Sequence, residues 1–222
     1  MLKLLLTAAI PFQSLVDRPS PSHGFINSQA LAILTADGKQ KHAAWLQHYL
    51  EPFNEGCDWA DTGWKNVGHM YDPETGMGFR GWPSAPQMLS EYWNLAVRYF
   101  GEQAPHQAFF YLGAAAHLVQ DLCVPHHAAA RLFSGHKAFE EYARRYRHLF
   151  AVRYGGLYGL ARTPEGWVIN NANYTRRHFS HCLTATVGRA ELHEAVAELL
   201  PRAQRSTAGF VSYYLRHVGV LE

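Results

Sequence analysis

The sequence has few cysteines, no long hydrophobic run and little net charge, and each shortage excludes a class of protein. Cys57, Cys123 and Cys182 form no CxxC pair and are too few and too widely spaced for the dense disulfide framework of small secreted domains. No stretch approaches the roughly 20 apolar residues that cross a bilayer. A net charge of +2, with histidine neutral, gives no electrostatic reason to expect a nucleic acid or an anionic membrane as partner.

Strand-like alternation of apolar and polar residues is also nearly absent. Apolar residues instead recur at the three-to-four-residue spacing of a helix face. The pattern predicts helices over residues 27–36, 41–53, 84–100, 105–122, 135–150, 171–186 and 190–217, with irregular segments at 71–83 and 153–170. We therefore predict an all-α fold, a single-domain multi-helix bundle formed by residues 23–222.

Residues 1–22 are predicted to be a lead-in that precedes this bundle. Lys3 is followed by a short apolar run that Pro11 closes, which resembles a signal segment at the lower limit of length. The Pro/Ser-rich segment 18–23 favours extended chain over helix.

What the chain has in abundance is histidine, with 14 residues, and the most informative histidines fall between residues 109 and 142. His117/Asp121 and His136/Glu140 are both spaced i, i+4, which places each pair on one helix face. His127 lies between the pairs. Helix 105–122 is apolar almost all round and therefore buried, so Asp121 needs a cation or strong hydrogen bonds. One such pair alone is also typical of a surface ion pair, but two pairs around His127 favour a metal site.

The candidate ligands extend upstream of this stretch. The full set of eight metal-ligating candidates is His23, Asp58, His69, His117, Asp121, His127, His136 and Glu140. Imidazole nitrogens and carboxylate oxygens are zinc ligands, and eight are too many for one tetrahedral ion. The set fits two or three zinc ions that share a bridging carboxylate, for which Asp121 is the best candidate.

The same stretch resembles a known family. Tyr-Leu-Gly-Ala-Ala-Ala-His-Leu-Val-Gln-Asp-Leu-Cys-Val-Pro-His-His-Ala at 111–128, followed by Gly-His-Lys-Ala-Phe-Glu at 135–140, resembles the bacterial zinc-dependent phospholipases C. These include the phosphatidylcholine-preferring enzymes and the catalytic domain of clostridial alpha-toxin. Residues 66–73 resemble the family's His-aromatic-Asp-Pro block, with Met70 standing before the aromatic Tyr71. The resemblance covers residues 23–142 and implies an all-α fold with a trinuclear zinc site in a cleft.

The resemblance also divides the ligands among three ions. It assigns one zinc to an upstream aspartate together with His69, His117 and Asp121, and a second to His127, His136 and Glu140. A third would use His23, the shared Asp121 and the N-terminal amino and carbonyl groups of a tryptophan. No tryptophan precedes Trp45 in this chain. Asp58 is the expected upstream aspartate and Asp61 the alternative.

The expected reaction is hydrolysis of the phosphodiester bond of a phospholipid by metal-bound water, which releases diacylglycerol and a phosphorylated headgroup. Asp58 is the predicted catalytic base, and Trp59 is a candidate substrate-binding residue through a cation–π contact with choline, although ordinary burial is the more common role of a tryptophan. The apolar side chains of loop 71–83 are candidates for peripheral membrane contact. We expect a secreted, monomeric protein without a nucleic-acid partner.

Two other interpretations stay open. A single-strand-specific zinc nuclease of the same superfamily typically carries Gly-Gly-Asn between the later ligands and an aspartate as the last one. This chain has Ser134-Gly135-His136 and Glu140, and no basic stripe with interleaved aromatic residues. The other alternative is a non-catalytic zinc-binding member of the family.

Overall fold

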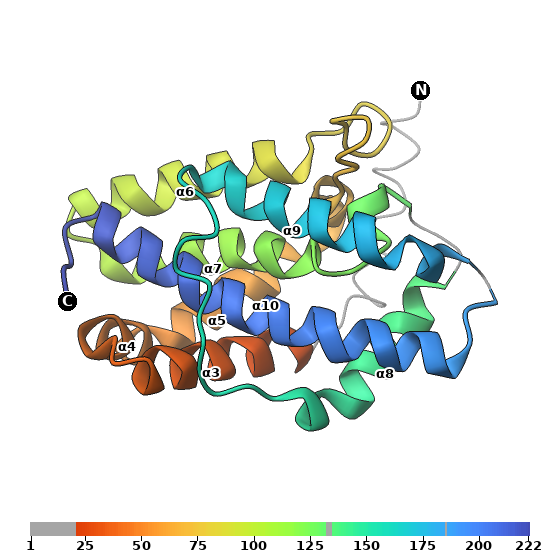
Figure 1. The fold of residues 1–222 in the computed structure, drawn as a ribbon. Helices are drawn as coiled ribbons and strands as arrows, with labels where there is room; N and C mark the ends of the chain where they lie inside the picture. The colour runs from red at the N-terminus through yellow and green to blue at the C-terminus, as the bar shows by residue number, and fades with distance from the viewer. Residues whose placement is uncertain (1–20, 132–134, 185) are drawn as a thin grey trace.

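The computed structural model describes residues 21–131, 135–184 and 186–222, and the described residues form a helical bundle (Figure 1). The α-helices are α3 (Pro21–Ala36), α4 (Gln40–His48), α5 (Leu50–Ala60), α6 (Ala85–Gly101), α7 (Pro105–Asp121), α8 (His136–Tyr146), α9 (Pro164–Phe179) and α10 (Arg189–His217). Four 3₁₀ turns are η1 (Gly63–His69), η2 (His127–Ala129), η3 (Arg147–Phe150) and η4 (Ser180–Leu183). Within these ranges the only β pairing is an isolated bridge between Asp72 and Met77, so the all-α prediction is confirmed. The predicted signal segment lies almost wholly outside the described residues.

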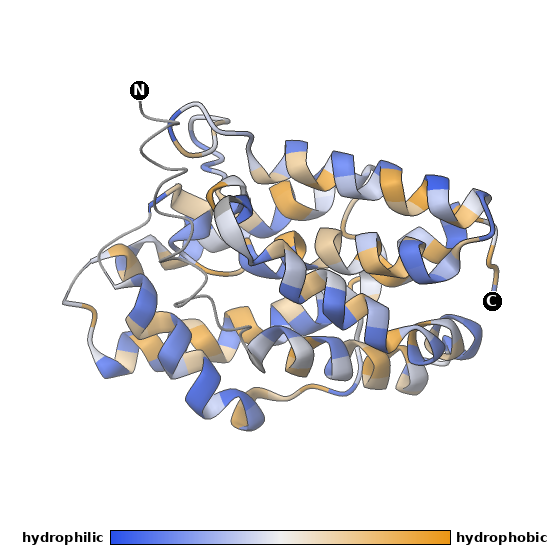
Figure 2. Cartoon of the chain, turned by 180° about the vertical axis from the view of Figure 1, so that it is seen from behind, coloured by the Kyte–Doolittle hydropathy of each residue, from blue (hydrophilic) through white to orange (hydrophobic). Residues whose placement is uncertain are grey.

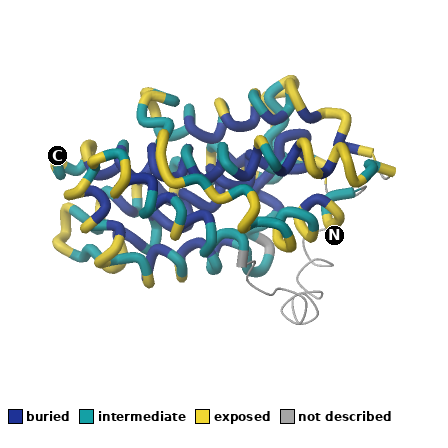
Figure 3. The backbone as a smooth tube through the Cα atoms, turned by 60° about the horizontal axis from the view of Figure 1, so that its bottom comes forward, coloured by how far each residue is buried: buried dark blue, intermediate teal, exposed yellow. Residues whose placement is uncertain are grey.

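Helix α7 is the central helix of the bundle, as its apolar sequence predicts. It lies between α5 and α6, its most extensive neighbours, and also packs against α9 and α10 (Figure 1). Its residues from Leu112 to Asp121 are all buried. Figure 3 shows the buried stretches of the chain, in dark blue, in the interior of the molecule. The outer helices carry both polar and apolar residues, as Figure 2 shows from behind. This arrangement places His117 and Asp121, near the end of α7, inside the protein.

Two glycines allow α5 and α7 to cross at backbone contact. A Cβ atom on Gly113 would overlap the carbonyl oxygen of Phe53, and one on Gly56 would overlap that of Phe110. Since both obstacles are backbone atoms of a neighbouring helix, no side chain can move aside to make room. The crossing fixes the end of α5, where the candidate aspartates lie, against the histidine-bearing turn of α7.

We expect Gly113→Ala to destabilise the protein by about 3 kcal/mol, because the added methyl must push the two helices apart in a packed core. Urea denaturation of the variant measures this change. Gly101→Ala is the matched control, because a Cβ atom there meets no other atom within 4 Å. Equal stability of Gly113→Ala and the wild type would contradict the close crossing.

Several helix boundaries differ from the sequence-based predictions, among them the ends of α5 at Ala60, α8 at Tyr146 and α9 at Phe179. Helix α3 begins at Pro21, so the segment predicted as extended already includes its first turn, and His23 is helical. Residues 41–53 form two helices that meet at Tyr49, because Pro52 has no N–H to continue the hydrogen-bond ladder. Helix α9 starts inside the segment predicted as irregular, where the Thr163 side chain accepts a hydrogen bond from the Gly166 N–H.

Asp37, which follows α3, holds the segment before α9 against the bundle. Its carboxylate accepts hydrogen bonds from the Gly155 and Gly156 N–H groups at 2.9 and 2.8 Å and from the Tyr158 hydroxyl at 2.6 Å. Burial alone would raise the pKa of Asp37, but these hydrogen bonds outweigh it and lower the pKa below the ordinary carboxyl value. The folded protein therefore favours the ionised form of the Asp37 carboxyl group.

We expect Asp37→Asn to lower stability by about 2 kcal/mol near neutral pH, since hydrogen bonds to a charged acceptor are lost. A lowered native pKa gives stability that is present above the unfolded pKa and is lost as the pH falls through the folded one. The difference between wild type and variant should therefore shrink in acid, which thermal unfolding across acidic and neutral buffers measures. A difference that is independent of pH would contradict this role.

None of the helices in the described ranges is both long and apolar enough to cross a lipid bilayer.

Candidate metal centre

Four imidazoles from four different elements converge on the carboxylate of Asp121. Its Oδ2 lies 2.9 Å from His69 Nδ1, 3.0 Å from His117 Nε2 and 3.4 Å from His127 Nδ1. Its Oδ1 lies 3.7 Å from His23 Nε2. These histidines lie on η1, α7, η2 and α3, and Asp121 is the last residue of α7. We call these five residues the Asp121 cluster; the sequence had indicated Asp121 as the shared carboxylate.

The donor atoms at the core of the cluster are spaced as ligands of one cation. His69 Nδ1, His117 Nε2 and Asp121 Oδ2 form a triangle with sides of 2.9, 3.0 and 3.1 Å. One proton cannot satisfy all three contacts of such a triangle. A tetrahedral zinc ion with bonds of about 2.0–2.2 Å holds its ligands about 3.3–3.6 Å apart, a few tenths of an ångström wider than this triangle. His127 Nδ1, which faces Asp121 Oδ2 at 3.4 Å, is buried without a hydrogen-bond partner, so a further nitrogen on the Asp121 side is left for a cation. The residues therefore fit a zinc ion.

A second group of donors lies beside the first. His136 Nε2 is 3.0 Å from His127 Nε2 and 2.9 Å from Glu140 Oε1. The pair on α8 is brought to one side of the helix by its i, i+4 spacing, as predicted. His127 contacts Asp121 through Nδ1 and His136 through Nε2, so its ring joins the two groups.

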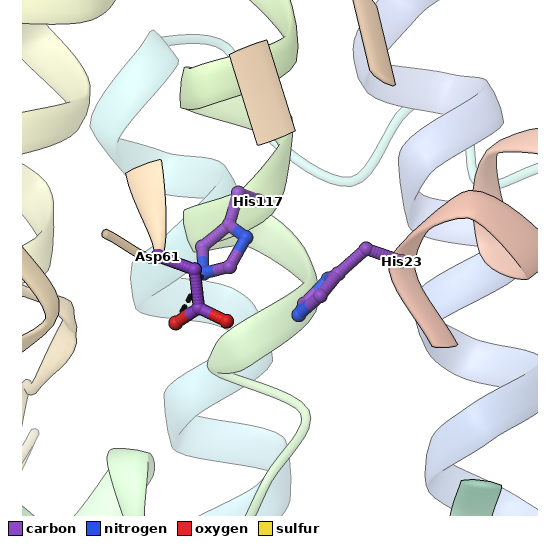
Figure 4. A group of neighbouring side chains, drawn as sticks. All are labelled: His23, Asp61 and His117. Carbon is purple, nitrogen blue, oxygen red and sulfur yellow. Dashed lines mark ion pairs between the residues drawn. The ribbon is translucent and has the colours of Figure 1, made fainter. Parts of the chain in front are cut away.

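The third group contains His23, His117 and Asp61 (Figure 4). Asp61 Oδ1 lies 3.9 Å from His117 Nε2, and the His23 and His117 rings are 4.1 Å apart. Asp61 follows the last residue of α5, where the chain turns towards η1. The structure thus brings the alternative aspartate, Asp61, among the donor atoms.

Asp58, the predicted upstream ligand and base, belongs to none of the three groups found among the described residues. It is near enough to interact electrostatically with His23 and His117. Burial raises the pKa of Asp58, an effect that the two histidines oppose and Asp61 reinforces. Its predicted role as base stays a prediction.

The charges of the cluster resemble those that a bound cation requires. Burial lowers the pKa of His69, and it lowers the pKa of His127 to about 4, so both rings are neutral. Burial opposes ionisation of Asp121 as well, but His117 and His127 hold the pKa of this carboxyl well below its usual value. For His117, the Asp121 charge outweighs burial and raises the pKa to about 9. Asp121 is therefore ionised, and a cation held by these residues would offset its negative charge.

Donor residues from all three groups line a cavity of about 310 Å³: His23, Asp61, Asp121, His127, His136 and Glu140. The same cavity is also lined by apolar side chains that belong to one hydrophobic cluster: Ile26, Phe139, Leu199, Leu200 and Ala203. The cavity therefore offers both metal-donor groups and apolar surface.

Trp59 is not among the residues that line this cavity. Its ring packs against Tyr92, Phe110 and Tyr111, and Lys65 Nζ lies 4.5 Å from the ring centroid. The chain's own lysine thus makes the cation–π contact that was predicted for choline. Substrate binding by Trp59 stays a prediction.

Comparison with known proteins agrees with a zinc-binding role for the chain. A profile of the family described as zinc dependent phospholipase C matches residues 22–205. The chain belongs to the zinc-dependent phospholipase C family. A phospholipase C of Bacillus cereus is 24% identical over 89% of this chain and 82% of its own length, and a second B. cereus phospholipase C matches equally well. Membership in the zinc-dependent phospholipase C family makes the chain a hydrolase.

Solved structures share the fold of this family member. The alpha toxin of Clostridium absonum superposes with a TM-score of 0.81 at 19% identity and covers 92% of this chain. An alpha-toxin of Clostridium perfringens from an avian strain gives 0.77 at 18% identity with the same coverage. The chain spans 67% and 66% of these two toxin chains.

Two polar residues next to the cluster were missed by the sequence analysis. Gln120 and Asn27 are fully buried, and Gln120 hydrogen-bonds to the ring of His23. Gln120 stands out in the sequence as a third polar residue near the end of an apolar helix, which was the available signal.

Proposed function

We propose that this protein is a phospholipase C that hydrolyses the phosphodiester bond of a phospholipid on its glycerol side, releasing diacylglycerol and a phosphorylated headgroup. The supporting observation is the cavity, whose lining combines the metal-donor groups with apolar side chains. A phosphodiester requires cationic stabilisation, whereas the glycerol and first acyl carbons favour apolar contact. At about 310 Å³ the cavity suits the phosphate and its immediate neighbours, so the acyl chains would stay outside.

Zinc, when bound, supplies a positive charge that lowers the pKa of water and offsets the charge that develops on the phosphoryl oxygens. The chain's own residues hold the donor atoms in place and dispose of the proton. Asp61 lines the cavity, so its carboxylate is placed to orient a water molecule and accept its proton. Asp58 lies one helical turn earlier and is the competing base.

We further propose that the centre holds two or three zinc ions, since His117 belongs to two of the three donor groups and Asp121 Oδ2 lies 3.4 Å from His127 Nδ1 of the third. An extracellular location fits the bacterial phospholipases and toxins that the chain resembles. Met77, in loop 71–83, is 68% exposed and is a candidate for shallow contact with a lipid surface.

The test combines metal analysis with two substrates on one preparation. Zinc per chain is measured by mass spectrometry, and hydrolysis of phosphatidylcholine vesicles and of single-stranded DNA is assayed in parallel. Two or three zinc ions with release of diacylglycerol support the proposal. Cleavage of DNA instead would assign the protein to the nuclease branch, and zinc without either activity would show a non-catalytic member.

A further inference from the structure

A row of buried polar side chains lies behind His23, on the side away from Asp121. Gln120 Oε1 is 2.7 Å from His23 Nδ1, and Gln120 Nε2 is 2.8 Å from Asn27 Oδ1. Asn27 Nδ2 is 3.4 Å from Cys57 Sγ, which lies 3.1 Å from the Gly113 carbonyl oxygen. Asn27, Cys57 and Gln120 are at most 2% exposed, so water does not compete for these contacts.

The direction of these hydrogen bonds is set at the end that is farthest from His23. A backbone carbonyl oxygen can only accept, so the Cys57 thiol must donate its single proton to Gly113. The sulfur is then an acceptor, and the Asn27 atom that faces it must be the amide nitrogen. Its second N–H is donated to Asn54 Oδ1 at 2.8 Å, which uses both donors of the Asn27 amide.

The assignment of hydrogen bonds extends from Asn27 to His23. Because the Asn27 amide nitrogen donates to Cys57 and Asn54, only the Asn27 oxygen is left to face Gln120, which must therefore present its amide nitrogen on that side. The Gln120 oxygen is left to face His23 Nδ1, and an oxygen of this kind can only accept. The four contacts thus form one consistent assignment, which rests on the Cys57 thiol donating to its nearer neighbour, the Gly113 carbonyl oxygen at 3.1 Å.

From this geometry we infer that Gln120, Asn27 and Cys57 are positioning residues that hold His23 as the Nδ1–H tautomer and direct the lone pair of Nε2 to the metal centre. His23 Nε2 is the atom that lies 3.7 Å from Asp121 Oδ1. A metal-binding histidine must present an unprotonated nitrogen, and the partner of its other nitrogen selects which one that is. The network performs this selection before any ion binds.

This role matters for His23 more than for the other ligands. His23 lies on the first turn of α3, next to the start of the described chain, and contributes the only donor atom from that helix to the three groups. Its neighbours on the centre, Asp61 and His117, do not hydrogen-bond to its Nδ1 in the described structure. Gln120 is next to Asp121 in sequence, so one turn of α7 supplies both a ligand and the residue that orients a second ligand.

The test reads the tautomer directly. Long-range proton–nitrogen NMR of the full chain, labelled with ¹⁵N-histidine, is recorded in alkaline buffer before and after zinc is removed by dialysis against a chelator. In wild type we expect His23 to carry its proton on Nδ1 in both states. Gln120→Met removes the acceptor at similar volume and should give a mixture of tautomers after zinc removal. Gln40→Met, at a surface hydrogen bond to Thr35, is the matched control and should keep the wild-type signature.

Zinc affinity gives an independent readout. Loss of an outer-shell partner of a ligating histidine weakens metal binding by roughly 10–100-fold. We expect this loss for one zinc per chain in Gln120→Met, and near wild-type affinity in Gln40→Met. A wild-type His23 protonated on Nε2 would overturn the inference even if no variant folded. An unchanged tautomer in a folded Gln120→Met variant would overturn it as well.

The inference relies on the proposed metal centre but not on the proposed lipid substrate. An Nδ1–H tautomer in a protein that binds zinc but cleaves no phospholipid would leave the inference standing and refute the proposed function.

Discussion

Asp121→Asn is expected to remove zinc from the centre and to lower phospholipid hydrolysis by at least about 10³-fold, because a metal ion contributes several kcal/mol to transition-state stabilisation. The carboxylate makes contacts of 2.9 to 3.7 Å with four imidazoles, so its replacement removes the anion that these four rings share. Asparagine has nearly the same shape, but its neutral oxygen binds a zinc ion far less well than a carboxylate does. Zinc per chain and kcat/KM on phosphatidylcholine measure the effect.

Glu141→Gln is the matched control for this experiment. It also replaces a carboxylate by an amide, but Glu141 is solvent-exposed and pairs with Arg144 on the outside of α8. We expect full zinc content and unchanged turnover in this variant. If Asp121→Asn behaved in the same way as Glu141→Gln, the Asp121 cluster would not be a metal centre.

The second large effect concerns the two aspartates at the end of α5. We expect Asp61→Asn to lower kcat by about 10²-fold or more, in the range of a lost general base, and to reduce zinc content. Asp58→Asn should have a smaller effect, because Asp61 and not Asp58 lies among the donor atoms of the centre. Rates and zinc content of the two single variants and of the double variant settle the assignment.

The reverse ranking, with Asp58→Asn as the inactive variant, would reinstate Asp58 as base and refute the assignment to Asp61. Circular dichroism of both variants separates loss of chemistry from loss of fold. Asp58 is partly buried near His23 and His117, so a moderate effect of Asp58→Asn on zinc affinity is compatible with its electrostatic role.

Much of the centre could be predicted because its strongest signals are local. The pairs on α7 and α8 are each spaced by one helical turn, and a helix places such residues together whatever the rest of the chain does. The apolar sequence of α7 likewise identified the central helix and the burial of Asp121, both of which the structure confirms.

What could not be predicted depends on where helices end and on contacts between distant segments. Whether Asp58 or Asp61 faces the centre is decided by the end of α5 at Ala60 and the turn into η1. The hydrogen bond of Gln120 to His23 joins residues 97 positions apart, and no periodic pattern encodes it. Trp59 contacts Lys65 only because η1 folds back over the end of α5, so its availability to a ligand could not be judged from sequence.

Because four elements converge on Asp121, metal binding is expected to change how the protein unfolds locally. Hydrogen exchange detects partial unfolding, in which single segments separate from a folded remainder at a lower free energy than the whole domain. The first turn of α3, η1 and η2 are short segments of this kind, and in the metal-free chain each can open by giving up its own contacts with Asp121. Cations held by the three donor groups would bind only when these segments are in place, so their binding free energy would oppose each partial opening. Metal loading should therefore merge separate, low-energy openings into a single cooperative unit that extends from α3 to α8.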